Sequence, residues 1–208
     1  MALDLQDQEE LENAKRAWKL WGRWVFLAML IAAALYLGNI VWKGQIEKRN
    51  AAAASIYDKE FQPKLIIQDT QNMLIALQKL QKEYPNSFAT SQATIEMADV
   101  SFSNAKYDDA ANHLKWLLQN QKQPIIRALT VQRLSVVYFQ QEKYDEALKI
   151  IEQEKLEPEF AARINNLKGD IYAAQGKKKE AQQAYNEALK QLPLQDVERK
   201  FIEVKSKL

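Results

Sequence analysis

Few residues of this chain could do chemistry, and they form no catalytic or metal-binding pattern. His113 is the only histidine, and the chain has no cysteine with which it could complete a metal site. The five glycines are scattered, so no glycine-rich phosphate loop occurs, and neither a G-x-S-x-G elbow nor an H-E-x-x-H helix is present. The sequence therefore predicts no enzyme and no catalytic, metal or cofactor site. A cryptic enzyme could use only acid pairs such as Asp108-Asp109, which at a helix start would stabilise the helix dipole instead.

Composition and charge indicate a helical chain that does not bind nucleic acid. The 208 residues carry 29 Lys and Arg against 27 Asp and Glu, a net charge of +2. This balance does not supply the basic surface that a nucleic-acid binder needs. Ala, Leu, Gln, Glu and Lys are abundant, whereas Gly and Pro number five each, so we expect an all-α fold. The absence of cysteine excludes disulfides and fits either side of a membrane.

The stretch Trp24–Trp42 predicts a membrane-spanning helix. Its residues are uncharged, with Arg23 before them and Lys43 after them. A helix of this length spans about 28 Å, close to the ~30 Å of bilayer hydrocarbon. A buried helix of a soluble core is usually shorter, and a cleaved signal peptide has an apolar run of only about 7–15 residues. We therefore expect an uncleaved anchor in the lipid bilayer, with tryptophans at the membrane interface: Trp18, Trp21, Trp24 and Trp42.

The segments on either side of the span are expected to be helical. Residues 1–23 begin acidic and end basic, with Leu11 and Trp18 on one apolar face, which predicts an amphipathic tail. Residues 43–62 predict a stalk or a first helix. The nearby positive charges do not set the orientation, because they are equal in number on the two sides of the span: Arg16, Lys19 and Arg23 before it, and Lys43, Lys48 and Arg49 after it.

Residues 63–208 contain an internal repeat. The segment Tyr107-Asp108-Asp109-Ala110 recurs as Tyr144-Asp145-Glu146-Ala147, 37 residues later, and as Lys178-Lys179-Glu180-Ala181 after 34 more. This period predicts tetratricopeptide-like helix pairs at about 91–120, 128–157 and 162–193, stacked as an α-solenoid. Small residues let the two helices of a pair approach, and aromatic residues fill the space between pairs. The expected packing positions are Ala98, Ala110, Ser135, Tyr138, Ala147, Gly169, Tyr172, Ala181, Tyr185, Ala188 and Pro193.

Further helices are expected at both ends of the repeats. Residues 66–84 predict a helix with Ile67, Leu74, Leu77 and Leu80 on one face. Glu157-Pro158 is expected to open the last pair, since proline suits the first helical turn. Residues 194–208 predict a C-terminal capping helix, with a partner-binding amphipathic helix as the alternative. Its apolar residues recur three and four apart: Leu194, Val197, Phe201, Val204 and Leu208.

The first helix of each pair is expected to line a concave face that binds partners. The exposed positions of that face are Gln92, Asp99 and Phe102, then Gln132, Val136 and Phe139, then Arg163, Asn166 and Asp170. The apolar members favour partly apolar contacts with a helix or an unfolded segment. Phe102 and Phe139 could equally be core residues between the pairs.

The N-terminal segment resembles the start of a known family. Ahead of the span lie Glu9, Glu10, Leu11, Lys15, Trp18 and Gly22, and Ala53-x-Ser55-x-Tyr57 follows it. This pattern, with repeats after it, is similar to the YfgM family of ancillary subunits of the bacterial SecYEG protein-export channel. The resemblance implies a single-pass inner-membrane protein with a cytoplasmic N-terminus, a periplasmic repeat domain and no catalytic residues.

The same resemblance implies partners. They are the SecYEG translocon and a PpiD-like periplasmic chaperone, with secreted polypeptides as further candidates for binding. A tetratricopeptide assembly factor for another envelope complex, such as a pilus or a cytochrome-maturation apparatus, is the alternative function.

Overall fold

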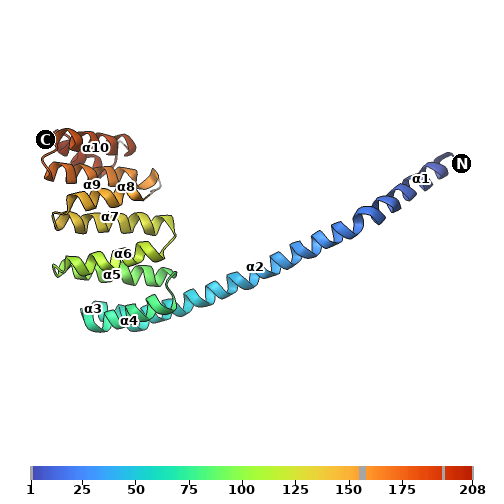
Figure 1. The fold of residues 1–208 in the computed structure, drawn as a ribbon, viewed down its shortest axis with the longest axis horizontal. Helices are drawn as coiled ribbons and strands as arrows, with labels where there is room; N and C mark the ends of the chain where they lie inside the picture. Colours follow the sequence, from blue (N-terminus) through green and yellow to red (C-terminus); the bar gives the residue numbers. More distant parts are fainter. Residues whose placement is uncertain (1, 155–157, 194, 208) are drawn as a thin grey trace. The chain divides into compact units, whose positions relative to one another are not determined.

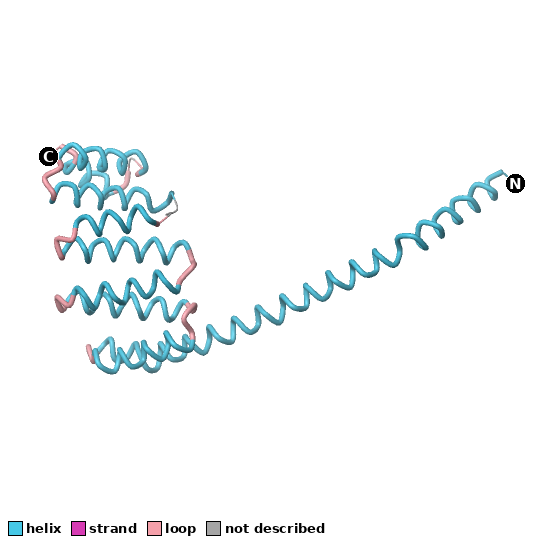
Figure 2. The backbone as a smooth tube through the Cα atoms, in the orientation of Figure 1, coloured by secondary structure: helices cyan, strands magenta, loops and turns pink. Residues whose placement is uncertain are grey.

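All regular structure in the described part of the chain is helical (Figures 1 and 2). The computed structural model describes residues 2–154, 158–193 and 195–207. The chain divides into two units, Met1–Arg49 and Asn50–Leu208. The expectation of an all-α fold is confirmed.

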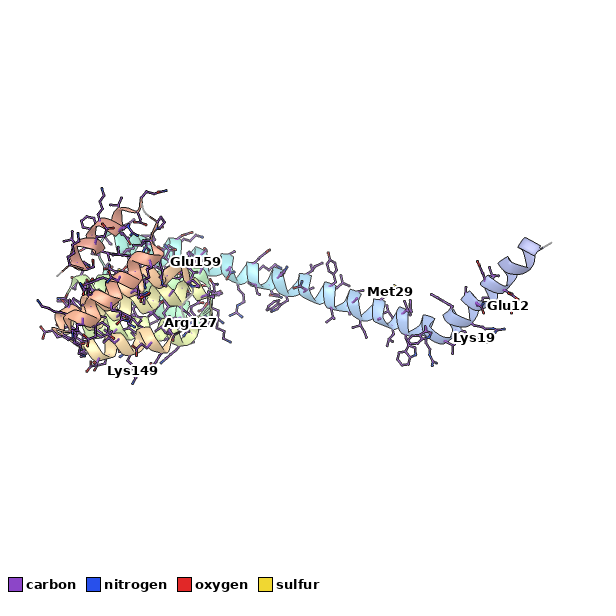
Figure 3. All side chains as sticks on the ribbon, turned by 90° about the horizontal axis from the view of Figure 1, so that it is seen from above. Glu12, Lys19, Met29, Arg127, Lys149 and Glu159 are labelled. Carbon is purple, nitrogen blue, oxygen red and sulfur yellow. The ribbon has the colours of Figure 1, made fainter. Side chains whose placement is uncertain are left out.

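The N-terminal unit contains an apolar helix with exposed side chains. Helix α1 (Ala2–Ala17) leads through a π-helical turn (Trp18–Gly22) into α2 (Arg23–Ile56). Within Trp18–Ile66 the helix is long and apolar enough to cross a membrane, with a mean hydropathy of 2.1 over its most apolar window. Figure 3 shows Met29 and other side chains projecting freely from α2. A helix that is apolar all round suits a lipid environment.

The tryptophans expected at the membrane interface are exposed. Trp18, Trp21, Trp24 and Trp42 are between 58% and 70% exposed. The ring of Trp18 covers Gly22, where an added Cβ would lie 2.8 Å from Trp18 Cδ2. Contact of these rings with lipid headgroups stays a prediction.

The second unit is a stack of antiparallel helix pairs, and α5 to α10 follow one another in chain order in Figure 1. The pairs are α5 (Phe88–Ser103) with α6 (Tyr107–Asn120), α7 (Pro124–Gln140) with α8 (Tyr144–Gln153), and α9 (Ala161–Ala174) with α10 (Lys178–Gln191). Helix α11 (Val197–Lys205) follows. A short 3₁₀ turn, Pro158–Phe160, precedes α9. Glu157, expected beside Pro158 at this start, lies outside the described residues.

A further helix pair, which sequence analysis did not identify, precedes these three. Its first helix consists of the end of α2, a π-helical turn (Tyr57–Phe61) and α3 (Gln62–Ile66), and its second is α4 (Thr70–Glu83). Ala53, Tyr57 and Phe61 are buried with Met73 and residues of α4 and α5 in one hydrophobic cluster. The segment expected as a stalk or first helix therefore contributes its last residues to the stack.

The same backbone turn closes all four pairs. A residue with positive φ follows each first helix: Gln68 (57°), Ala105 (57°), Glu142 (60°) and Gly176 (73°). The next N–H donates to the carbonyl five residues earlier, and Asp69 to Lys64 and Lys106 to Ser101 are both 2.9 Å. This is the Schellman arrangement that satisfies the last carbonyls of a helix.

Small residues let the helices of a pair approach. In the three predicted repeats, Ala98, Ser135 and Gly169 on the first helices are all buried, as are Ala110, Ala147 and Ala181 on the second helices. The Ser135 hydroxyl donates to the carbonyl of Ala147 at 3.4 Å. Tyr185 is 4% exposed and Ala188 is fully buried, whereas Tyr138 and Tyr172 are half-buried and Pro193 is exposed.

Arg127 joins neighbouring pairs through backbone and carboxylate contacts. Its guanidinium donates to the carbonyls of Leu118 (2.6 Å) and Gln121 (2.8 Å), at the end of α6. It also donates to Glu154, after α8, at 2.6 Å. Figure 3 labels Arg127 on α7. One side chain thereby satisfies helix-end carbonyls and holds two loops together.

The face predicted for residues 66–84 is partly wrong. The left-handed residue Gln68 turns the chain before α4, so Ile67 is not in the helix and is 66% exposed. Asp69 caps α4 by accepting the N–H of Asn72 at 3.2 Å. The buried residues of α4 are Met73, Ala76, Leu77 and Leu80, while Leu74 is 36% exposed.

The face predicted for the C-terminal helix is also wrong. Val197, Phe201 and Val204 are 73%, 68% and 65% exposed, whereas Ile202 is buried against α10. Burial of Ile202 sets this orientation, and two ion pairs lie on the same side of the helix: Glu198 with Arg163 (3.7 Å) and Lys205 with Asp170 (2.8 Å). Leu194 and Leu208, the other residues of the expected apolar face, lie outside the described residues.

The close packing at Gly169 predicts that adding one methyl group there destabilises the fold. In Gly169→Ala the new Cβ would collide with the ring of Tyr185, so we expect a loss of about 1–3 kcal/mol in unfolding free energy. Denaturant unfolding of the full chain in detergent, followed by circular dichroism, measures it. Gly44→Ala is the matched control, because a Cβ there meets nothing within 4 Å. Equal stability of the two variants would contradict the packing described.

Candidate partner-binding groove

The structure brings four of the nine predicted groove residues around one cavity. This cavity, of about 210 Å³, lies between α5 and α7 and is called the apolar cavity below. Its walls are Asp99 and Phe102 from α5, Gln132 and Val136 from α7, and Ala98, Leu114, Arg133 and Val137. Most of these side chains are apolar, so the cavity suits an aliphatic or aromatic side chain.

Arg133 is a rim residue that sequence reasoning missed. Its Nε lies 3.3 Å from Asp99 Oδ1, and both side chains are substantially exposed. The two residues are 34 positions apart, so opposite charges one repeat apart were a usable signal. An exposed pair of this kind contributes little to stability. The ion pair holds the Asp99 and Arg133 side chains in place at the rim of the apolar cavity.

The two phenylalanines differ in their surroundings. Phe102 packs edge-on against Tyr107, with ring centroids 5.3 Å apart, and also lines the apolar cavity. Phe139 packs against Tyr144 at 5.7 Å, and it is not among the residues that line this cavity. Both rings pack on the edge of the main hydrophobic cluster.

A second cavity adjoins the first, and Asp99 lines both. It measures about 480 Å³ and is called the acidic cavity below. Its other walls are Leu65, Gln68, Thr70, Glu96, Val100, Ser103 and Asn104. Leu65, Gln68 and Thr70 belong to the helix pair that sequence analysis did not identify, so this cavity could not have been placed from the repeats alone.

Glu96 is held in the acidic cavity by neutral hydrogen-bond donors. The Tyr57 hydroxyl lies 2.9 Å from both carboxylate oxygens of Glu96. The amide of Gln92, a predicted groove residue, donates to Tyr57 Oη at 2.7 Å and to Glu96 Oε1 at 3.1 Å. Burial and the neighbouring Glu96 raise the pKa of Tyr57, so its hydroxyl remains a donor at neutral pH.

The three groove residues predicted on α9 contact α11 instead of an open surface. Arg163 pairs with Glu198. Lys205 donates to Asn166 Oδ1 at 3.3 Å and to Asp170 at 2.8 Å, and the Tyr185 hydroxyl donates to Asp170 at 2.7 Å. The open part of the candidate groove therefore lies on α5 and α7, and its role in binding partners stays a prediction.

Comparison with known proteins covers nearly the whole chain. A family model described as a tetratricopeptide repeat-like domain matches residues 15–207. The chain is 39% identical to the ancillary SecYEG translocon subunit of Neisseria gonorrhoeae, over 99% of this chain and 98% of the relative. The chain belongs to the YfgM family. Proteins with the same name from Haemophilus influenzae and Aggregatibacter actinomycetemcomitans are each 24% identical over 90% of this chain and 91% of their own length.

The comparisons confirm the resemblance to the YfgM family read from the N-terminal segment. The match to the Neisseria protein extends over nearly the whole chain and so takes in the apolar helix as well as the repeats. The family is non-catalytic. Stacked helical repeats provide extended concave surfaces that bind other proteins.

His113 is half-buried on α6. Among the described residues, no three His, Asp or Glu side chains gather closely enough to hold a metal ion. Burial lowers the pKa of His113, and the nearby Asp109 opposes this effect. A histidine of this kind is neutral in the folded chain and protonates more readily after unfolding.

This difference predicts a pH dependence of stability. The unfolded chain binds the His113 proton more tightly, so stability is lost as pH falls through about 6.5, the pKa of an exposed histidine. We expect wild type to lose more unfolding free energy between pH 7.5 and 5.5 than His113→Gln does. Asp109→Asn should enlarge the wild-type loss, because Asp109 favours the protonated ring. Parallel pH profiles of wild type and His113→Gln would contradict the assignment.

Proposed function

We propose that this chain is a non-enzymatic subunit that assists protein export at the SecYEG translocon. Residues 1–23 lie in the cytoplasm, the Trp24–Trp42 helix spans the bacterial inner membrane once, and the repeat domain lies in the periplasm. There it contacts a PpiD-like membrane-anchored chaperone and secreted polypeptides.

Full-length identity of 39% to a protein named ancillary SecYEG translocon subunit carries this proposal. Repeats alone would be weak support, since tetratricopeptide domains serve many unrelated assemblies. The match includes the lead-in and the apolar helix, which other repeat proteins have no reason to share. The exposed apolar surface of α2 and the groove on α5 and α7 fit a membrane-anchored protein that acts by binding other proteins.

Association with the translocon is tested by copurification. We expect SecYEG and a PpiD-like chaperone to copurify with the tagged full chain after extraction in mild detergent. A matched protein that keeps residues 50–208 but carries an unrelated membrane anchor shows whether the native lead-in and span are needed. Recovery of pilus or cytochrome-maturation proteins in place of SecYEG would support the alternative envelope function and contradict ours.

The orientation is tested by cysteine labelling, for which a chain without native cysteine is well suited. We expect a membrane-impermeant maleimide to label Lys122→Cys, in the exposed loop before α7, in cells whose outer membrane has been opened. Glu10→Cys, in the N-terminal helix, should react only after the inner membrane is broken. The reverse pattern would place the repeats in the cytoplasm.

A further inference from the structure

We infer that two adjoining cavities, the apolar cavity on α5 and α7 and the acidic cavity between α3, α4 and α5, bind a polypeptide segment in which an apolar residue stands next to a basic one. The apolar cavity would take the aliphatic or aromatic side chain, and the acidic cavity would take the Lys or Arg. The inference rests on the proposed function, because it specifies which segments the repeat domain binds.

The acidic cavity carries a negative charge that the described part of the chain does not neutralise. Asp99 pairs with Arg133, and Asp170 pairs with Lys205. Glu96 differs, because its described hydrogen-bond partners are the neutral Tyr57 and Gln92, and no Lys or Arg of the described chain forms an ion pair with it. Two neutral donors hold the carboxylate in a fixed orientation without cancelling its charge, which prepares it for a cation.

The two cavities are close enough to be filled by neighbouring residues of one segment. Asp99 belongs to the walls of both, so they share a boundary. The apolar cavity, on one side of Asp99, is lined by Phe102, Val136 and Leu114. In the acidic cavity, on the other side, Glu96 lies among mainly neutral groups. A side chain that bridged the boundary would place its apolar stem along Val100 and its charge near Glu96, as Lys and Arg commonly do.

The remaining charges disfavour other partners. An acidic segment would meet Glu96 and Asp99, and Arg133 is the rim cation already engaged by Asp99. A wholly apolar segment would leave the charge of Glu96 desolvated and unpaired, which costs free energy. An apolar residue beside a basic one satisfies both cavities at once.

The test uses the full chain in non-ionic detergent and fluorescein-labelled decapeptides of the sequence GSGLKFKGSG. Two comparison peptides replace the lysines by glutamate or the Leu and Phe by serine. Fluorescence anisotropy, corrected for empty micelles, should rank the Leu-Lys peptide first. Binding should weaken as ionic strength rises, because the pair with Glu96 is partly exposed.

Variants of each cavity show how much that cavity contributes to peptide binding. Glu96→Gln keeps an acceptor for Tyr57 and should weaken binding of the Leu-Lys peptide about three- to tenfold, with a smaller salt dependence. Val136→Phe should fill the apolar cavity and reduce binding of the Leu-Lys peptide to the level of the serine peptide. Glu146→Gln, an exposed acid on α8, is the matched control and should bind as wild type does. Circular dichroism checks that each variant folds.

The outcomes separate this inference from the proposed function. Equal binding of the glutamate peptide, or an unchanged affinity in Glu96→Gln, would overturn the inference even if SecYEG still copurifies. Failure of copurification by a chain that discriminates the peptides would overturn only the proposed function. Self-association of the wild-type chain that Glu96→Gln abolishes, seen by sedimentation without peptide, would make a second copy the occupant and overturn the inference as well.

Discussion

Three of the four helix pairs in the second unit, α5 with α6, α7 with α8 and α9 with α10, depend on a close approach between their two helices, and that approach requires a small residue at one point. At Gly169 the neighbouring ring is Tyr185, which leaves no room for a Cβ. Ala98 and Ser135 stand at the matching positions of the preceding pairs, opposite the buried Ala110 and Ala147. A pair packed this way still has one apolar face uncovered, so it must stack on a neighbour. The main hydrophobic cluster accordingly runs through α5 to α9 without interruption.

Stacking by this rule also creates the candidate groove. Because the first helices of successive pairs lie in one row, side chains one repeat apart meet, and Arg133 reaches Asp99 from the next helix. Between two such helices this leaves a space whose walls include Phe102 of α5, Val136 of α7 and the buried Leu114 of α6. The groove is thus a consequence of the packing that stabilises the fold. The residue types at its walls can vary without loss of the fold, and they determine what the groove can bind.

The three helix pairs with repeated residue types could be predicted from the sequence. The first helix pair could not, because other residue types occupy the same positions in it. Counted from the turn, Phe61 and Met73 occupy the positions that Ala98 and Ala110 hold one pair later, so the first pair carries no small-residue signal. Its turn nevertheless has the same hydrogen bond, from Asp69 to the carbonyl of Lys64. The first pair therefore has the same backbone turn as the others but different side chains. A search for sequence periodicity detects only repeated side chains, so it misses this pair. The groove residues on α5 and α7 were predictable from repeat position, whereas Glu96 became evident only once Tyr57 was placed beside it.

Helix α11 shows why periodicity alone could not decide which surfaces are open. Its most regular apolar residues, Val197, Phe201 and Val204, suggested a buried face, yet the helix turns Ile202 inward. Ile202 packs on α10, and the ion pairs on that side of α11 join residues that are distant in the sequence: Glu198 with Arg163 and Lys205 with Asp170. Those same contacts use the charges of α9, so the C-terminal end of the first-helix row is already occupied by the chain itself. At the other end Glu96 has no such cation in the described part of the chain, so we expect a basic partner at the acidic cavity between α3, α4 and α5.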